Sequence, residues 1–118
     1  MGRAEAMENY RRFSTTGQSE LKLNCALLGY FDLDEVTEAE RAEYEKYLKF
    51  RVRPASEKIV RMDDTEKLQK LYELGGFTEQ QIRVLMGIAG EEGRLSSLAW
   101  LLRLKKQNYG YQDKDFSL

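Results

Sequence analysis

Residues 65–106, TEKLQKLYELGGFTEQQIRVLMGIAGEEGRLSSLAWLLRLKK, decide the fold of this chain. Three segments of the stretch repeat apolar residues at helical spacing, and short runs with glycine or threonine separate them. Capping residues mark the helix boundaries in this order: Asp63 or Asp64, then Gly75 with Gly76, then Thr78 with Gln81, then Gly90, and a third start near Arg94. The pattern predicts three consecutive helices.

These three helices are expected to pack against one another through their apolar faces. The residues expected to face inward are Leu68, Leu71, Leu74, Ile82, Leu85, Met86, Ala89, Leu95, Leu98, Leu101 and Leu102. Trp100, the one tryptophan in the chain, is expected near the centre of this core.

The residues before this stretch predict further short helices. Residues 19–29 favour a helix with Ser19 as a candidate N-cap, and a short buried strand is the alternative. Thr37 and Glu40 form a capping-box pattern, which predicts a helix from Glu38 to near Arg51. The following segment, up to residue 61, is either a short helix starting at Pro54 or a small hairpin.

The fold class that follows is all-α: a single-domain bundle of five or six short helices with a three-helix C-terminal core. Residues 1–18 form a polar N-terminal extension, 19–62 the N-terminal helices, 63–107 the core and 108–118 an aromatic tail. The length of 118 residues suits one domain. One proline and nine glycines are too few for the many turns of a sandwich or barrel.

Composition excludes several chemistries. The chain has no histidine and one cysteine, Cys25, so Cys/His zinc sites and Ser-His-Asp or Cys-His catalysis are impossible. The acidic block 32–45 is expected to be a solvated helix start, since it lacks the glycine and final glutamate of an EF-hand loop. We therefore expect no catalytic residue, no metal and no cofactor.

The location expected for the chain is the cytoplasm. A single cysteine fits a reducing compartment, and no stretch reaches the ~18 consecutive apolar residues of a membrane span. The N-terminus has charge but no apolar region behind it, so it does not resemble a secretory signal. A net charge of −1 gives no global attraction for nucleic acid or membranes, so any such preference must come from local patches.

The segment LYELGGFTEQQIRVLMGIAGEEGRLSSLAWLL resembles the ubiquitin-associated (UBA) domain, a three-helix bundle. The resemblance lies in the turn Leu74–Phe77 and in the third-helix run Leu98–Leu102. It implies peptide or protein binding through the Gly-Phe turn and the third helix. With the aromatic residues of the tail, the candidate protein-binding residues are Gly76, Phe77, Tyr109, Tyr111 and Phe116.

A second resemblance is to the opening of bacterial winged-helix regulators, in FTEQQIRVLMGIAGEEGRLSSLAWLLRL. It implies DNA binding by a helix-turn-helix. The basic segment 46–61 and the end of the last helix would supply phosphate contacts. The candidate nucleic-acid-binding residues are Lys49, Arg51, Arg53, Lys58, Arg61, Arg94, Arg103, Lys105 and Lys106.

From these observations we expect a small non-enzymatic adaptor or regulatory protein that binds another protein. Missing catalytic chemistry, together with a high density of surface charge and aromatic residues, favours this function. The alternative is a nucleic-acid-binding regulator that uses the basic residues named above. The sequence leaves the partner and the oligomeric state open.

Overall fold

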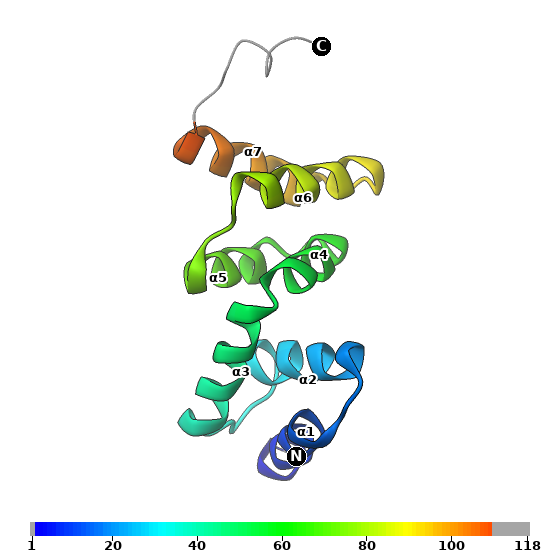
Figure 1. Ribbon diagram of the computed structural model, residues 1–118, viewed down its shortest axis with the longest axis vertical. Helices are drawn as coiled ribbons and strands as arrows, with labels where there is room; N and C mark the ends of the chain where they lie inside the picture. Colours follow the sequence, from blue (N-terminus) through cyan, green and yellow to red (C-terminus); the bar gives the residue numbers. More distant parts are fainter. Residues whose placement is uncertain (1, 110–118) are drawn as a thin grey trace. The chain divides into compact units, whose positions relative to one another are not determined.

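The computed structural model describes residues 2–109, and these residues form seven α-helices and no strand. The helices are α1 (Gly2–Thr15), α2 (Ser19–Phe31), α3 (Glu38–Phe50), α4 (Val52–Met62), α5 (Thr65–Gly75), α6 (Glu79–Glu91) and α7 (Leu95–Tyr109) (Figure 1). The all-α prediction is confirmed. The count exceeds the expected five or six because α1 was expected to be an extension.

The chain divides between Ala55 and Ser56 into two compact units. Unit 1 contains α1 to α3 and unit 2 contains α5 to α7, while α4 begins in unit 1 and ends in unit 2. Each unit is described by itself below. The expectation of a single domain stays a prediction.

Several helix starts that were predicted from capping residues in the sequence agree with the structure. Thr37 accepts a hydrogen bond from the Glu40 amide, and the Glu40 carboxylate accepts one from the Thr37 amide, which makes a complete capping box. Asp64 caps α5, and Thr78 caps α6 by accepting from the Gln81 amide. The capping pattern in the sequence therefore located the starts of α3, α5 and α6.

Two helix starts differ from the prediction, and two open alternatives are settled. Residues 19–31 and 52–62 are both helical, which rules out the strand and the hairpin. Gln18, not Ser19, occupies the N-cap of α2, and no side chain caps it. α4 starts at Val52, ahead of Pro54, because amides in the first turn need no intrahelical partner and a proline is tolerated there.

The prediction of a polar extension over residues 1–18 was wrong. Residues 2–15 form α1, which packs against α2 and buries Ala6, Asn9 and Phe13. The Asn9 amide donates to the Cys25 carbonyl and to the Tyr44 hydroxyl, both at 2.9 Å. The three buried positions follow helical spacing, but Asn9 is polar, so the apolar pattern of the sequence did not predict a buried face here.

Tyr44 of α3 is the centre of the core of unit 1. Its ring is fully buried and meets Phe13 edge-on, with the ring centroids 4.9 Å apart. Gly29 of α2 lies directly against this ring: a Cβ atom added there would be 2.3 Å from Tyr44 Cε2 and 2.9 Å from Asn9 Nδ2. The close approach of α2 and α3 therefore requires a glycine at this position.

Arg3 and Glu40 tie the start of α1 to the start of α3. Arg3 donates to both carboxylate oxygens of Glu40, at 2.8 and 2.5 Å, and to the Glu35 carbonyl at 2.7 Å. The hydrogen bond from Arg3, helped by the Thr37 amide, lowers the pKa of Glu40 from 4.5 to about 2. Stability from this contact is thus present above pH 4.5 and is lost as the pH falls towards 2.

Replacing Glu40 by glutamine should lower the free energy of unfolding by roughly 1–2 kcal/mol at neutral pH, because the charge-assisted contact with Arg3 is lost while the glutamine oxygen can still accept from the Thr37 amide. Urea unfolding at pH 7 and near pH 2 checks this by circular dichroism. The difference from wild type should shrink at the lower pH. Glu38→Gln removes an equal charge from the same turn and is the control. Equal acid sensitivity of wild type and Glu40→Gln would contradict the assignment.

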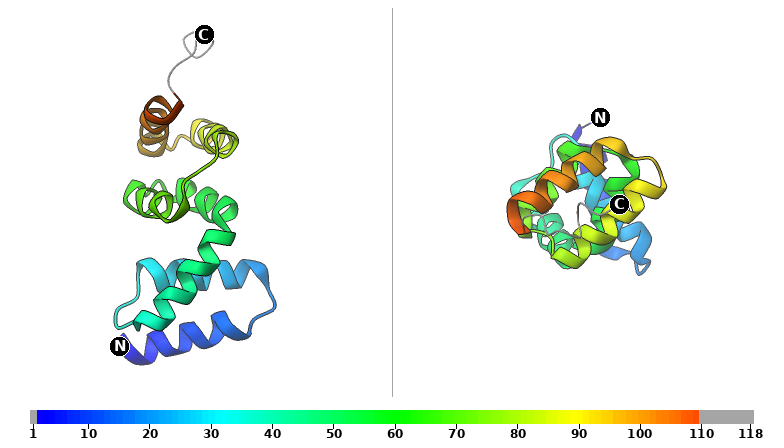
Figure 2. Two further views of the ribbon diagram at one scale, coloured as in Figure 1. Left: turned by 60° about the vertical axis from the view of Figure 1, so that its left-hand side comes forward. Right: turned by 90° about the horizontal axis from the view of Figure 1, so that it is seen from above.

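In unit 2, α7 packs against both α6 and α5, and α6 and α7 lie side by side in both views (Figure 2). Most residues expected to face inward are buried: Leu68, Leu71, Ile82, Leu85, Ala89 and Leu101. Leu95 and Leu102 were expected inside but are 72% and 37% exposed. The buried stripe of α7 consists instead of Ser97, Leu101 and Leu104. Because Ser97 is polar, the apolar periodicity of the sequence did not indicate which face of α7 is buried.

The connections before α5 and before α7 have the same backbone form. Asp63 and Gly93, thirty residues apart, both have positive φ, at 56° and 68°. The amide after each bonds back five residues: Asp64 to the Ile59 carbonyl at 3.4 Å, and Arg94 to the Ala89 carbonyl at 2.8 Å. Asp63 also accepts from the Ser97 amide at 2.8 Å, which lowers the pKa of its carboxyl. The matched turns show a thirty-residue period in unit 2.

Candidate functional site

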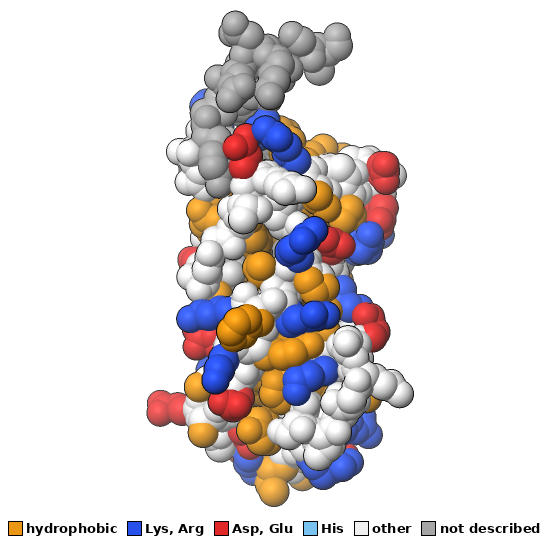
Figure 3. All heavy atoms as spheres, in the orientation of Figure 1, with side chains coloured by type: hydrophobic (Ala, Val, Ile, Leu, Met, Phe, Trp, Pro, Cys, Tyr) orange, Lys and Arg blue, Asp and Glu red, His pale blue; other side chains and the backbone are white. Residues whose placement is uncertain are grey.

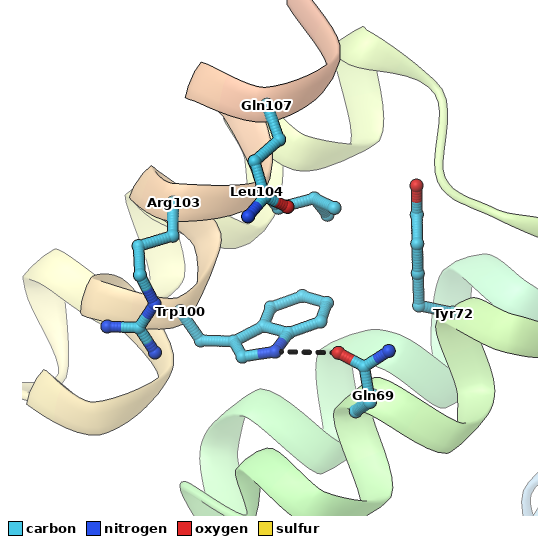
Figure 4. A pocket seen from close by; sticks show the side chains of 6 residues that line it. All are labelled: Gln69, Tyr72, Trp100, Arg103, Leu104 and Gln107. Carbon is cyan, nitrogen blue, oxygen red and sulfur yellow. Dashed lines mark hydrogen bonds between the residues drawn. The ribbon is translucent and has the colours of Figure 1, made fainter.

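Trp100 lies at the surface of unit 2, not near the centre of its core as expected. Its side chain is half-buried, and the indole Nε1 donates to Gln69 Oε1 at 3.1 Å (Figure 4). Trp100 immediately precedes the buried Leu101, so it falls beside the buried stripe of α7. The hydrogen bond to α5 holds the ring between the two helices.

Two other rings fix the position of the indole. Tyr72 of α5 and Phe77 of the α5–α6 turn meet Trp100 edge-on, with ring centroids 5.9 and 6.3 Å away. Tyr72 and Phe77 also contact each other at 5.4 Å, and the Tyr72 hydroxyl accepts from Asn108 Nδ2 at 2.8 Å. One hydrogen bond and two ring contacts therefore fix the position of the Trp100 indole at the surface.

Two hollows adjoin Trp100. The first, of about 280 Å³, is lined by Gln69, Tyr72, Trp100, Arg103, Leu104 and Gln107 (Figure 4). The second, of about 350 Å³, is lined by Thr65, Glu66, Gln69, Lys70, Glu73 and Trp100. Because Gln69 and Trp100 line both, the hollows form one feature between α5 and α7, here called the α5/α7 groove.

The two parts of the α5/α7 groove differ in charge. Among residues 2–109, Arg103 is the one cation that lines the first hollow, and no carboxylate of these residues lines it. The second has Glu66 and Glu73 against Lys70. One part therefore attracts an acidic group and the other, on balance, a basic one.

Of the predicted protein-binding residues, two lie next to this groove. Gly76 ends α5 with φ 74°, and Phe77 is buried, with 6% of its surface exposed, so its ring supports Trp100 from behind. Tyr109 is the last residue of α7, and its side chain is outside the described residues, as are Tyr111 and Phe116. A binding role for these residues stays a prediction.

The predicted nucleic-acid-binding residues are distributed over both units. Lys49, Arg51 and Arg53 lie in unit 1; Lys58, Arg61, Arg94, Arg103, Lys105 and Lys106 lie in unit 2. Arg61 pairs with Glu92 at 3.0 Å, and Arg94 is half-buried. Arg103 lines the α5/α7 groove. Their contact with nucleic acid stays a prediction.

No group of three or more metal-ligating side chains is present among residues 2–109. Burial raises the pKa of the Cys25 thiol, so its reactive thiolate form is disfavoured. None of the helices in this range is long and apolar enough to cross a membrane.

Comparison of the chain with protein-family models, curated protein sequences and solved structures found no match.

Sequence reasoning missed the groove residues Gln69 and Tyr72, and it misplaced Trp100. A signal was present in the thirty-residue period, which aligns Leu68 with Leu98 and Leu71 with Leu101. The same offset aligns Trp100 with Lys70, a position that a charged residue marks as solvent-facing. The period therefore indicates that Trp100 lies outside the core.

Proposed function

We propose that this chain is a small non-enzymatic adaptor that binds a segment of a partner protein in the α5/α7 groove. The observation that supports it best is the placement of Trp100, half-buried, fixed by Gln69 and lining both hollows. Tryptophan is enriched where binding energy concentrates at protein interfaces, because its large ring loses little conformational entropy on contact. A reducing cytoplasm is the proposed setting.

The proposed ligand is a short peptide segment with three properties. An apolar side chain packs against Trp100 and Leu104, an acidic residue pairs with Arg103, and a basic residue lies near Glu66 and Glu73. A hollow of about 280 Å³ suits one large side chain. The matched turns of unit 2 add support, since helical repeats commonly bind partners along a surface built from equivalent helices.

The resemblance to UBA domains supports the same class of function, protein binding. The proposed binding surface differs in part from the one that the resemblance implies. That resemblance implies binding through the Gly-Phe turn and the third helix. The groove uses the third helix, α7, whereas Phe77 packs behind Trp100 instead of projecting outward. Membership of that family remains a proposal.

Selection of a phage-displayed random peptide library on the full-length chain tests this function. Enriched peptides should combine an acidic, a large apolar and a basic residue, and their binding should shift the Trp100 fluorescence. Arg103→Glu should weaken binding at least about tenfold by reversing the charge at one end of the groove. Arg83→Glu, on the exposed surface of α6, is the matched control. Equal effects of the two variants, or peptides that leave the fluorescence unchanged, would argue against the groove.

A further inference from the structure

We propose that unit 1 binds single-stranded nucleic acid through the exposed side chains of Lys46, Lys49, Phe50 and Arg53, here called the Phe50 patch. This site is independent of the proposed peptide groove, because it lies in the other unit and takes a different ligand. It shares Lys49 and Arg53 with the helix-turn-helix alternative, but it takes a single strand that stacks on Phe50 instead of duplex DNA.

The first observation is the exposure of Phe50. Its side chain is 81% exposed, the highest value among the large hydrophobic residues of the described chain. It is the last residue of α3, and Arg51 caps the helix immediately after it. An aromatic ring left almost wholly in water loses the stabilisation of burial, which a flat apolar partner restores by covering its face.

The second observation is the charge around that ring. Residues 46–53, KYLKFRVR, contain four cations and no carboxylate. Lys46, Lys49 and Phe50 share one stripe of α3 because they are three and four residues apart, and all are exposed. Figure 3 shows Lys and Arg side chains beside apolar side chains over the α3 region, with Asp and Glu side chains also present there. An aromatic ring between cations matches a base between phosphates.

The geometry favours a single strand over a duplex. A protruding ring stacks on an unpaired base, whereas the base faces of a duplex are already covered by their neighbours. The part of α3 before the patch is acidic, with Glu38, Glu40, Glu43 and Glu45. Their charge repels phosphates and confines the contact to a few nucleotides beside Phe50.

The test is fluorescence anisotropy of a labelled oligouridylate of about 12 nucleotides, titrated with the full-length chain at about 50 mM salt. Phe50→Ala should weaken binding roughly five- to tenfold, while Phe50→Trp should retain it. Lys46→Gln with Lys49→Gln should reduce the slope of log affinity against log salt by about 1.4, since each single-strand phosphate contact contributes about 0.7.

Leu95→Ala is the matched control, because Leu95 is 72% exposed but lies in unit 2. Absence of binding, or equal binding by Phe50→Ala and wild type, would overturn the proposal. So would equal affinity for a duplex of the same length, or binding to phosphatidylglycerol vesicles without binding to the oligonucleotide. Arg83→Glu, on the exposed surface of α6, should leave oligonucleotide binding unchanged. Peptide binding is measured separately on the same chain, so failure of the peptide groove and failure of this site are distinguishable.

Discussion

Replacing Gly29 by alanine is expected to lower the free energy of unfolding by about 2–3 kcal/mol. The added Cβ would meet the Tyr44 ring at 2.3 Å, and that ring is fully buried and held by its contact with Phe13 and by Asn9. Neither the ring nor the helix backbone can move aside without disturbing other packed groups. Urea unfolding followed by circular dichroism measures the loss.

Gly87→Ala is the matched control, since Gly87 lies inside α6 with nothing within 4 Å of an added Cβ. There the same substitution should stabilise the chain by about 0.5–1 kcal/mol, because alanine has the higher helix propensity and the unfolded chain loses freedom. Opposite signs at the two glycines are the expected result. Stabilisation at both positions would show that α2 and α3 are not packed as closely as described.

Replacing Asn9 by alanine is expected to cost about 2–4 kcal/mol, which is large for a polar residue in a charged N-terminal helix. The Asn9 amide donates to the Cys25 carbonyl and the Tyr44 hydroxyl, so its removal leaves two buried groups without this donor and opens a void between α1 and α2. The free energy of unfolding from a urea titration gives the effect.

Met7→Ala on the same helix is the control, because Met7 is 56% exposed and should change stability by less than about 0.5 kcal/mol. If residues 1–18 were only an extension, both substitutions would be equally harmless. A small effect of Asn9→Ala would therefore restore the sequence-based expectation for this segment.

The parts of the fold predicted from sequence are those that depend on local chemistry. A helix cap depends only on a few neighbouring residues. The capping box of Thr37 and Glu40 and the cap at Thr78 therefore predicted the starts of α3 and α6 correctly. The apolar periodicity around Leu71 and Leu85 placed the core of unit 2 in the same way.

The parts that were missed depend on polar residues buried by contacts distant in sequence. The Asn9 side chain donates to groups of α2 and α3, the Gln81 side chain donates to Ser56 Oγ at 3.0 Å, and the Ser97 backbone amide donates to the Asp63 carboxylate. A hydropathy pattern counts each as a surface position, because it contains no information on the partner that satisfies it. The buried stripe of α7 was therefore predicted on the wrong residues, and Trp100 was predicted in the core although it lines the groove.

The equivalence of the turns at Asp63 and Gly93 bears on how this chain could change in length. Residues 64–93 contain one complete cycle: an N-cap, two helices and the left-handed residue that ends the second. In a tandem duplication of that segment, Gly93 would precede a second copy of Asp64, as Asp63 precedes Asp64 now. Each helix of the second copy would then follow the same kind of turn as in the first. Unit 2 is thus compatible with growth by whole cycles, and each added cycle would lengthen the surface formed by the first helix of each cycle, which is the surface of α5 and α7 here.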